Sequence, residues 1–108
     1  MQELSKISNG VKKLTTKKKI PALPGVYFFK DSRGKIMYIG KAANLRSRIG
    51  SYFNKSASLN AVKSAMLEKA AEIDWQIYDS EIEALVLEAR LIKRHRPKYN
   101  VLMKDDKN

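Results

Sequence analysis

Two short hydrophobic runs, 25–30 and 36–39, lie close together in the first half of the chain and are separated by polar residues. Both runs are rich in aromatic and β-branched residues, which favour β-strands. Between them, Asp31 can hydrogen-bond to its own backbone and Gly34 can adopt a positive φ angle, as tight turns require. The pattern therefore predicts a β-hairpin.

The hairpin brings two tyrosines together. If the turn is symmetric about Ser32 and Arg33, Tyr27 lies directly opposite Tyr38, with both side chains on the same face of the sheet. An odd number of loop residues would break this register. Cross-strand aromatic pairs commonly stabilise sheets, so the pair alone does not indicate a function.

After the hairpin, apolar residues recur at helical spacing in two segments. The first follows Asn44, a suitable N-cap, and its predicted core-facing stripe is Leu45, Ile49, Tyr52 and Phe53. The second spans 59–72, with a stripe of Val62, Met66, Ala70 and Ile73. The alternation over 74–78 predicts a third strand, in which we expect Trp75 to fill the core.

A third helical segment begins at Ser80, which has the spacing of a capping box with Glu83. We expect this helix to stop near Arg96, because Pro97 would clash within a continuing helix. Its predicted core stripe is Ile82, Leu85, Val86, Ala89 and Ile92. Glu88 lies at the edge of this stripe and needs a partner, because an unpaired buried carboxylate would raise its pKa and become neutral. A bound cation and an arginine are the two alternatives.

These elements define an α/β fold, a small three-stranded antiparallel sheet flanked by helices. The strands are expected near residues 25–30, 35–40 and 74–78. One domain is expected over residues 20–103, because a chain of 108 residues supports a single modest core. Residues 1–19 are interpreted as a basic N-terminal arm or short helix, and residues 104–108 as a frayed or truncated C-terminal end.

Positive charge is concentrated in the first half of the chain. Residues 1–50 contain 12 lysines and arginines against two acids, whereas residues 51–108 contain 10 against nine, within a net charge of +11. This asymmetry favours an anionic partner, most simply nucleic acid. A soluble basic protein without a polyanionic partner is the alternative.

The rest of the composition indicates the cellular compartment of the protein. The absence of cysteine excludes disulfides and thiolate metal sites and is consistent with a reducing compartment. No run of 18 apolar residues is present, and no apolar signal-peptide core precedes the hairpin. We therefore expect a cytoplasmic protein with no membrane partner.

Polar residues suited to phosphate follow the second strand. Gly40 permits close approach of the backbone, and the cations after it can donate hydrogen bonds to phosphate oxygens. The candidate nucleic-acid-binding residues are Lys41, Asn44, Arg46 and Arg48.

With these residues the chain resembles the GIY-YIG nuclease family. The two signature triplets are Gly25-Val26-Tyr27, with valine in place of the usual isoleucine, and Tyr38-Ile39-Gly40. A third block, 81–100, which ends in Arg96-Pro97-Lys98-Tyr99-Asn100, is similar to the N-terminal nuclease domain of the UvrC family, the incision subunits of bacterial nucleotide excision repair. The resemblance covers roughly residues 20–103.

The resemblance implies a metal-dependent endonuclease domain that hydrolyses a DNA phosphodiester bond, on the 3′ side of the lesion in the UvrC family. The family's catalytic set falls on Tyr27, Tyr38, Gly40, Lys41, Arg48, Glu88 and Asn100. In this scheme Glu88 holds a single Mg²⁺ or Mn²⁺ ion and Arg48 stabilises phosphate charge. Tyr38 acts as the base or orients the attacking water, Tyr27 positions that water or Tyr38, and Asn100 braces the site.

The implied partner is DNA, which UvrC proteins meet as a UvrB–DNA complex through regions that lie outside this chain. Three other interpretations stay open: a stand-alone structure-specific GIY-YIG nuclease, a non-catalytic nucleic-acid-binding module whose tyrosines stack on bases, and a docking domain for an acidic protein. Glu88 discriminates among them, because pure binding has no need of a half-buried carboxylate beside a polyanion.

Overall fold

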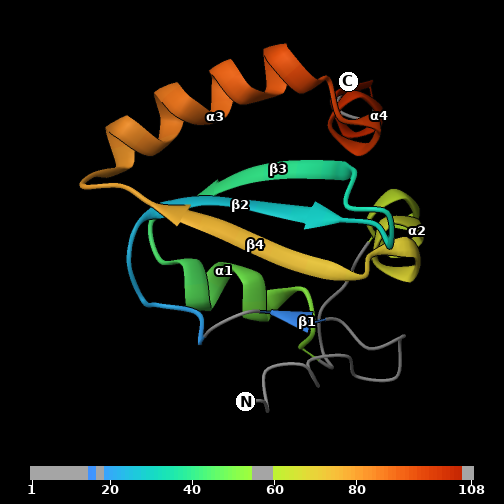
Figure 1. Ribbon diagram of the computed structural model, residues 1–108, viewed down its shortest axis with the longest axis horizontal. Coiled ribbons are helices and arrows are strands. Elements are labelled where there is room, and N and C mark those ends of the chain that lie inside the picture. The colour runs from blue at the N-terminus through green and yellow to red at the C-terminus, as the bar shows by residue number, and fades with distance from the viewer. Residues whose placement is uncertain (1–14, 17–18, 55–59, 106–108) are drawn as a thin grey trace.

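The computed structural model describes residues 15–16, 19–54 and 60–105, and its centre is a four-stranded sheet (Figure 1). The strands are β1 (Thr15–Thr16), β2 (Gly25–Lys30), β3 (Ile36–Ala42) and β4 (Glu72–Ile77), in the order β1-β4-β2-β3. β2 pairs antiparallel with β3 and with β4, which confirms the predicted three-stranded sheet. β1 adds a short parallel strand beside β4.

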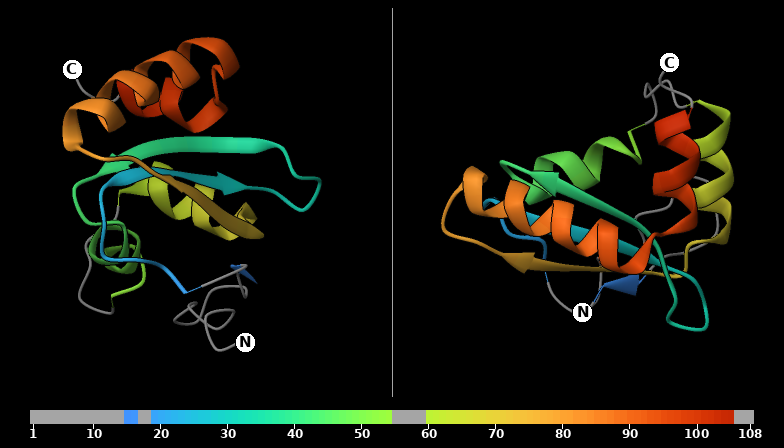
Figure 2. Two further views of the ribbon diagram at one scale, coloured as in Figure 1. Left: turned by 60° about the vertical axis from the view of Figure 1, so that its left-hand side comes forward. Right: turned by 90° about the horizontal axis from the view of Figure 1, so that it is seen from above.

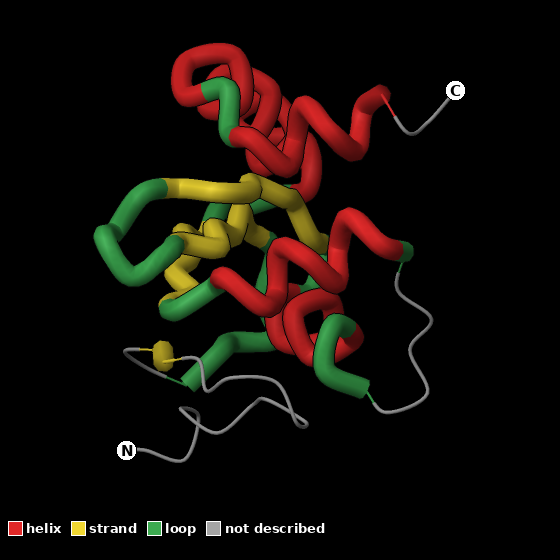
Figure 3. The backbone as a smooth tube through the Cα atoms, turned by 90° about the vertical axis from the view of Figure 1, so that its right-hand side faces the viewer, coloured by secondary structure: helices red, strands yellow, loops and turns green. Residues whose placement is uncertain are grey.

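Four helices in the described part of the chain cover this sheet: α1 (Leu45–Ser51), α2 (Ala61–Lys69), α3 (Glu81–His95) and α4 (Lys98–Asp105). α3 lies along one side of the sheet and α1 along the other, as Figures 1 and 2 show. Figure 3 shows helices on both sides of the sheet, and α4 packs against α2. Both α3 and α4 contact β3, the outermost strand, so the two C-terminal helices cover the free edge of the sheet.

Side chains alternate along β2 between two hydrophobic clusters, as the two-residue period of a strand requires. Tyr27 and Phe29 join the larger cluster, which α1 and α2 cover. Val26 and Phe28 join a smaller cluster with Ile39 and Ala84, on the side that α3 covers. β2 is therefore buried on both faces, which explains its continuous apolar sequence.

The hairpin forms as predicted, but its register differs. Tyr27 pairs with Gly40, and Tyr38 pairs with Phe29, so the predicted direct pairing of Tyr27 with Tyr38 is wrong. The register shifts after Phe29, and the loop closes through Asp31, whose carboxylate accepts hydrogen bonds from the backbone of Arg33 and Lys35. The two tyrosines are diagonal neighbours on one face, with ring centroids 6.2 Å apart.

Residues 1–14 lie outside the described part of the chain, so most of the expected basic arm or short helix has no structural account here. Thr15 and Thr16 form β1 rather than the end of a helix.

α1 follows its prediction closely. Asn44 caps it by accepting a hydrogen bond from the Ser47 N–H at 3.0 Å. The whole predicted stripe is buried: Leu45, Ile49, Tyr52 and Phe53. α2 is shorter than predicted, ending at Lys69, because Ala70 is already extended and β4 begins at Glu72.

The ends of α3 also agree with prediction. Ser80 Oγ accepts a hydrogen bond from the Glu83 N–H at 3.2 Å, and the Glu83 carboxylate accepts one from the Asp79 N–H. At the other end Arg96 adopts a left-handed conformation with φ 44°, and Pro97 follows. The helix thus stops where proline requires it to stop.

The predicted core stripe of α3 is wrong except at Ile92, which packs against the smaller cluster. Ile82, Leu85 and Val86 are 72%, 49% and 45% exposed, whereas Ala84 packs against the sheet with Leu87 and Leu91 beside it. α3 carries apolar residues on two faces, and helical spacing alone does not reveal which face meets the sheet. The observed choice turns Glu88 toward β3.

α4 was not predicted. It begins directly after the Arg96–Pro97 turn, buries Tyr99, and includes residues 104 and 105 of the expected frayed end. Residues 106–108 lie outside the described part of the chain. No helix in the described residues is long and apolar enough to cross a membrane.

Candidate active site

Three tyrosine hydroxyls meet on the α1 side of the sheet. Tyr27 comes from β2, Tyr38 from β3 and Tyr52 from the C-cap of α1. The hydroxyl oxygens of Tyr27 and Tyr52 lie 2.9 Å apart, and Tyr52 also hydrogen-bonds to Tyr38. These three residues form what we call the tyrosine cluster, and Tyr52 links the two tyrosines of the signature triplets.

Gly40 makes room for the tyrosine cluster. It is the register partner of Tyr27, and a Cβ atom at Gly40 would lie 2.5 Å from the Tyr27 side chain. Any larger residue at this position would displace the ring. The sequence suggested that Gly40 lets a phosphate approach the backbone, but the contact that it makes in the structure is with Tyr27.

Burial raises the pKa of Tyr27 and that of Tyr38 well above the ordinary tyrosine value. Tyr52 adds to both shifts, because a second phenolate nearby would repel the first, whereas Arg48 lowers the pKa of each tyrosine. Tyr38 is the most accessible member of the cluster, since Tyr27 and Tyr52 are 2% and 6% exposed. A phenolate at Tyr38 therefore requires additional positive charge at the site.

Arg48 supplies one such charge from α1. It lines a shallow groove of about 320 Å³ together with Ala43, Asn44, Ser47 and Ser51. Arg46, on the same helix, donates a hydrogen bond from Nε to the carbonyl of Ile20 at 2.9 Å, which ties α1 to the segment before β2. Of the two arginines, Arg48 is the one that acts on the tyrosine cluster.

Glu88 approaches β3 from α3. Its half-buried carboxylate accepts a hydrogen bond from the backbone N–H of Lys41. Burial raises the pKa of this carboxyl, and the Lys41 charge and N–H oppose the shift. Glu88 also raises the pKa of Tyr38, so the carboxylate and the phenol interact across the edge of the sheet.

Asn100 holds the same edge from α4. Its Oδ1 accepts a hydrogen bond from the Ile39 N–H at 2.8 Å, and its Nδ2 donates one to the Ile39 carbonyl at 2.9 Å. Asn100 and Glu88 together satisfy backbone groups on the outer edge of β3 that would otherwise lack a strand partner. This edge carries Tyr38 and Gly40, so Asn100 fixes the strand on which the site is built.

Glu88 also fits a hard divalent cation. Its carboxylate supplies oxygen, the ligand preferred by Mg²⁺ and Mn²⁺, and Lys41 only partly offsets the cost of burying its charge. In the described ranges, no three His, Cys, Asp or Glu side chains gather as a metal-binding group. A cation at Glu88 would therefore keep water or phosphate oxygens as its other ligands, as Mg²⁺ commonly does.

The structure thus brings the predicted residues Tyr27, Tyr38, Lys41, Arg48 and Glu88 to the β3 edge, and Asn100 fixes that edge. His95 is exposed at the end of α3. Tyr52 is the site residue that sequence reasoning missed, because its spacing fits the core stripe of α1. The available signal was its hydroxyl, since a buried tyrosine usually needs a hydrogen-bond partner.

A sequence profile of the UvrC-like GIY-YIG domain matches residues 23–101. The UvrABC system protein C of Cyanothece sp. is 54% identical over 90 residues, which cover 83% of this chain and 14% of that protein. Its counterpart from Carboxydothermus hydrogenoformans is 50% identical over 91 residues, covering 84% and 15%. The chain therefore spans about one seventh of the length of these curated relatives.

Solved structures indicate the same family. The GIY-YIG N-terminal endonuclease domain of UvrC from Thermotoga maritima, bound to its catalytic divalent cation magnesium, has a TM-score of 0.66 and 42% identity over 74% of this chain and 85% of that one. Three tyrosine-to-phenylalanine mutants and one asparagine-to-alanine mutant of that domain are likewise bound to the cation.

The fold and the constellation at the β3 edge define an endonuclease domain of the GIY-YIG class. Within that class, the chain belongs to the UvrC-like GIY-YIG family, as the sequence motifs predicted.

Proposed function

We propose that this domain hydrolyses a phosphodiester bond of DNA with a divalent cation held at Glu88. The observation that carries the proposal is the meeting of the tyrosine cluster, Arg48 and Glu88 at one edge of the sheet, although they come from four different elements. A binding module would not need a carboxylate at the place where phosphate must approach.

Glu88 is the residue that would hold the cation, Mg²⁺ or Mn²⁺. When bound, such an ion neutralises charge on the scissile phosphate and stabilises the leaving oxygen. The Lys41 N–H orients the Glu88 carboxylate by occupying one of its acceptor sites. One protein carboxylate suffices for a single ion, since water and phosphate supply the other ligands.

The other side chains of the site have separate roles in the reaction. Tyr38, the accessible phenol of the cluster, orients the attacking water or accepts its proton, and Tyr27 and Tyr52 hold it through their hydroxyl network. Arg48 donates to the phosphate oxygens as negative charge develops and favours ionisation of Tyr38. Lys41, Asn44 and Arg46 contribute to the grip on the DNA backbone.

At the level of the whole protein, we propose the 3′-side incision of nucleotide excision repair as the reaction. DNA would be met as a UvrB–DNA complex, through regions outside this chain, in the cytoplasm. The identity to UvrC proteins supports this proposal over a stand-alone nuclease with its own target.

A plasmid-nicking assay tests the proposed activity. Supercoiled DNA should be converted to the open circular form in Mg²⁺ or Mn²⁺ and stay intact in EDTA. Arg48→Ala should abolish most of the nicking, whereas Arg33→Ala at the hairpin turn, which removes the same charge away from the site, should preserve it. Nicking that continues in EDTA, or equal activity of both variants, would contradict the proposal.

A further inference from the structure

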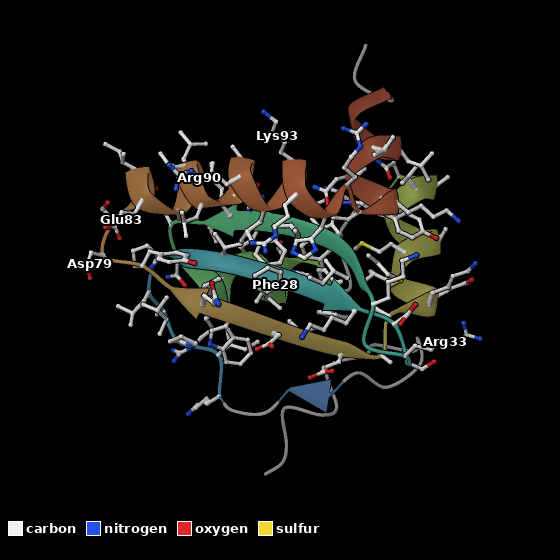
Figure 4. The ribbon with its side chains drawn as sticks, turned by 45° about the horizontal axis from the view of Figure 1, so that its top comes forward. Phe28, Arg33, Asp79, Glu83, Arg90 and Lys93 are labelled. Atoms are coloured by element: carbon white, nitrogen blue, oxygen red, sulfur yellow. The ribbon has the colours of Figure 1, made fainter. Side chains whose placement is uncertain are left out.

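A run of basic residues joins α3 to α4 and takes no part in the site described above. Its basic members are all exposed, and no acid lies among them: Lys93, Arg94, His95, Arg96 and Lys98. We call residues 93–98 the basic turn. Within the described part of the chain none of its cations forms an ion pair. Lys93 projects away from the sheet, at the opposite end of α3 from the acids Asp79 and Glu83 (Figure 4).

Helix electrostatics explains only part of this run. Basic residues in the last turn of α3 stabilise the negative end of the helix dipole, which accounts for Lys93, Arg94 and His95. Arg96 lies beyond that turn in the left-handed conformation, with φ 44° and ψ 58°. Glycine or asparagine takes this conformation at lower cost, so an arginine here is a poor choice for the fold alone.

The basic turn is fixed in position relative to the site. Arg96 follows Glu88 by eight residues, which corresponds to about 12 Å along the helix axis. On its other side Pro97 is buried, and Asn100 is bonded to Ile39 on the strand that carries Tyr38. A distance of about 12 Å equals the rise of roughly three to four nucleotides of a DNA strand.

We propose that the basic turn binds the phosphate backbone of DNA a few nucleotides away from the bond cleaved at Glu88, with Arg96 as its central contact. The inference rests on the proposed nuclease function and adds the path of the DNA on the protein. The DNA follows α3 from the site toward α4. Its exposed cations, which form no ion pair among the described residues, match a polyanion, and their rigid attachment to β3 sets the register of the DNA strand in the site.

Arg96→Gly separates this proposal from a structural role, because the two make opposite predictions. Glycine relieves the left-handed conformation, so the melting temperature should stay the same or rise. DNA binding should weaken about 3- to 10-fold in Kd, and the slope of log K against log salt should become shallower by about 0.9, as expected for one lost phosphate contact. Fluorescence anisotropy with a labelled duplex in EDTA measures binding without cleavage.

Two comparisons make the test specific. Arg33→Ala removes an equal charge from an exposed residue of the hairpin turn between β2 and β3, away from α3 (Figure 4), and should change Kd less than twofold. Arg96→Lys keeps the charge and should retain most of the affinity. Equal losses for Arg96→Gly and Arg33→Ala would show that the effect depends only on net charge and would overturn the proposal, as would unchanged binding by Arg96→Gly.

Further outcomes separate this inference from the proposed function. If Arg96→Gly weakens binding to poly-glutamate but not to duplex DNA, the surface fits an acidic protein and the DNA proposal is overturned. If the wild type cuts DNA and Arg96→Gly binds duplex DNA with the wild-type Kd, only the assignment of the basic turn is wrong. If the wild type neither binds nor cuts DNA, the nuclease proposal fails, and this inference fails with it.

Discussion

The side-chain amide of Asn100 forms both of its hydrogen bonds with the backbone of one residue, Ile39. Through this pair α4 replaces the strand that the outer edge of β3 lacks, at the residue between Tyr38 and Gly40. Edge strands usually need such cover, and here the cover also determines where the strand that carries Tyr38 lies.

Replacing Asn100 by alanine should therefore lower both stability and activity. The Ile39 N–H and carbonyl would lose their partners, which costs roughly 1–3 kcal/mol in the free energy of unfolding. Urea denaturation measures that loss, and nicking should fall at the same time because Tyr38 is no longer held. Asn100→Asp keeps an acceptor for the Ile39 N–H but repels the Ile39 carbonyl. A stability equal to that of wild type for both variants would contradict the role of Asn100 in holding the edge.

Tyr52 offers a second test, because sequence spacing assigned it to the core. Tyr52→Phe keeps the ring packing and removes the hydroxyl that joins Tyr27 and Tyr38. We expect a loss of about 1–3 kcal/mol in stability, since the buried Tyr27 hydroxyl loses its partner. Nicking should fall about 10-fold or more, because Tyr38 loses part of its orientation.

Tyr78→Phe is the matched control, because Tyr78 lies after β4 and hydrogen-bonds to the exposed Gln76 side chain. It should leave nicking unchanged. If Tyr52→Phe also cuts at the wild-type rate, the hydroxyl of Tyr52 serves packing and not the reaction.

How much of this site the sequence reveals depends on the residue. The hairpin, the Asn44 and Ser80 caps and the stop at Pro97 follow from local rules that tertiary contacts do not change. The strand register does not follow from local rules, because it depends on a shift after Phe29 that no residue type predicts. Tyr27 and Tyr38 still share a face, since a slip of two residues preserves the alternation of a strand.

The orientation of α3 shows a second limit. Ile82, Leu85 and Val86 make the stronger apolar stripe, yet Ala84 and Leu87 meet the sheet. The small Ala84 lets the helix approach β2 and β3 closely, and that approach brings Glu88 to Lys41. Such a choice depends on the shape of the sheet, which helical periodicity does not encode.

DNA binding should depend steeply on salt. The chain carries a net charge of +11, and its lysines and arginines would displace counterions condensed on the duplex. If about six phosphates are neutralised, the slope of log K against log salt is roughly −5. Anisotropy titrations between about 50 and 200 mM salt measure this slope, and a value near zero would leave the polyanion assignment without support.

The stability of the domain should respond to pH through Glu88. Its pKa is raised in the folded state by burial, so ionisation of this carboxyl opposes folding. Stability associated with Glu88 is present below the unfolded-state pKa of about 4.3 and is lost as pH rises through the folded-state value. Glu88→Gln should therefore be more stable than wild type at pH 7, and the difference should vanish below about pH 4 in urea denaturation. A variant less stable than wild type at pH 7 would contradict the raised pKa.

The same substitution separates an enzyme from a binding module. Glu88→Gln keeps the size and the acceptor for the Lys41 N–H but removes the charge that retains a divalent cation. Mg²⁺ should raise the melting temperature of wild type and leave that of the variant unchanged. Nicking should fall about 10³-fold or more, equivalent to about 4 kcal/mol of transition-state stabilisation. Binding to duplex DNA should persist or tighten, because a negative charge facing phosphate is gone while Lys41 and Arg48 remain. Cleavage at the wild-type rate in the same Mg²⁺ would show that the cation is held elsewhere.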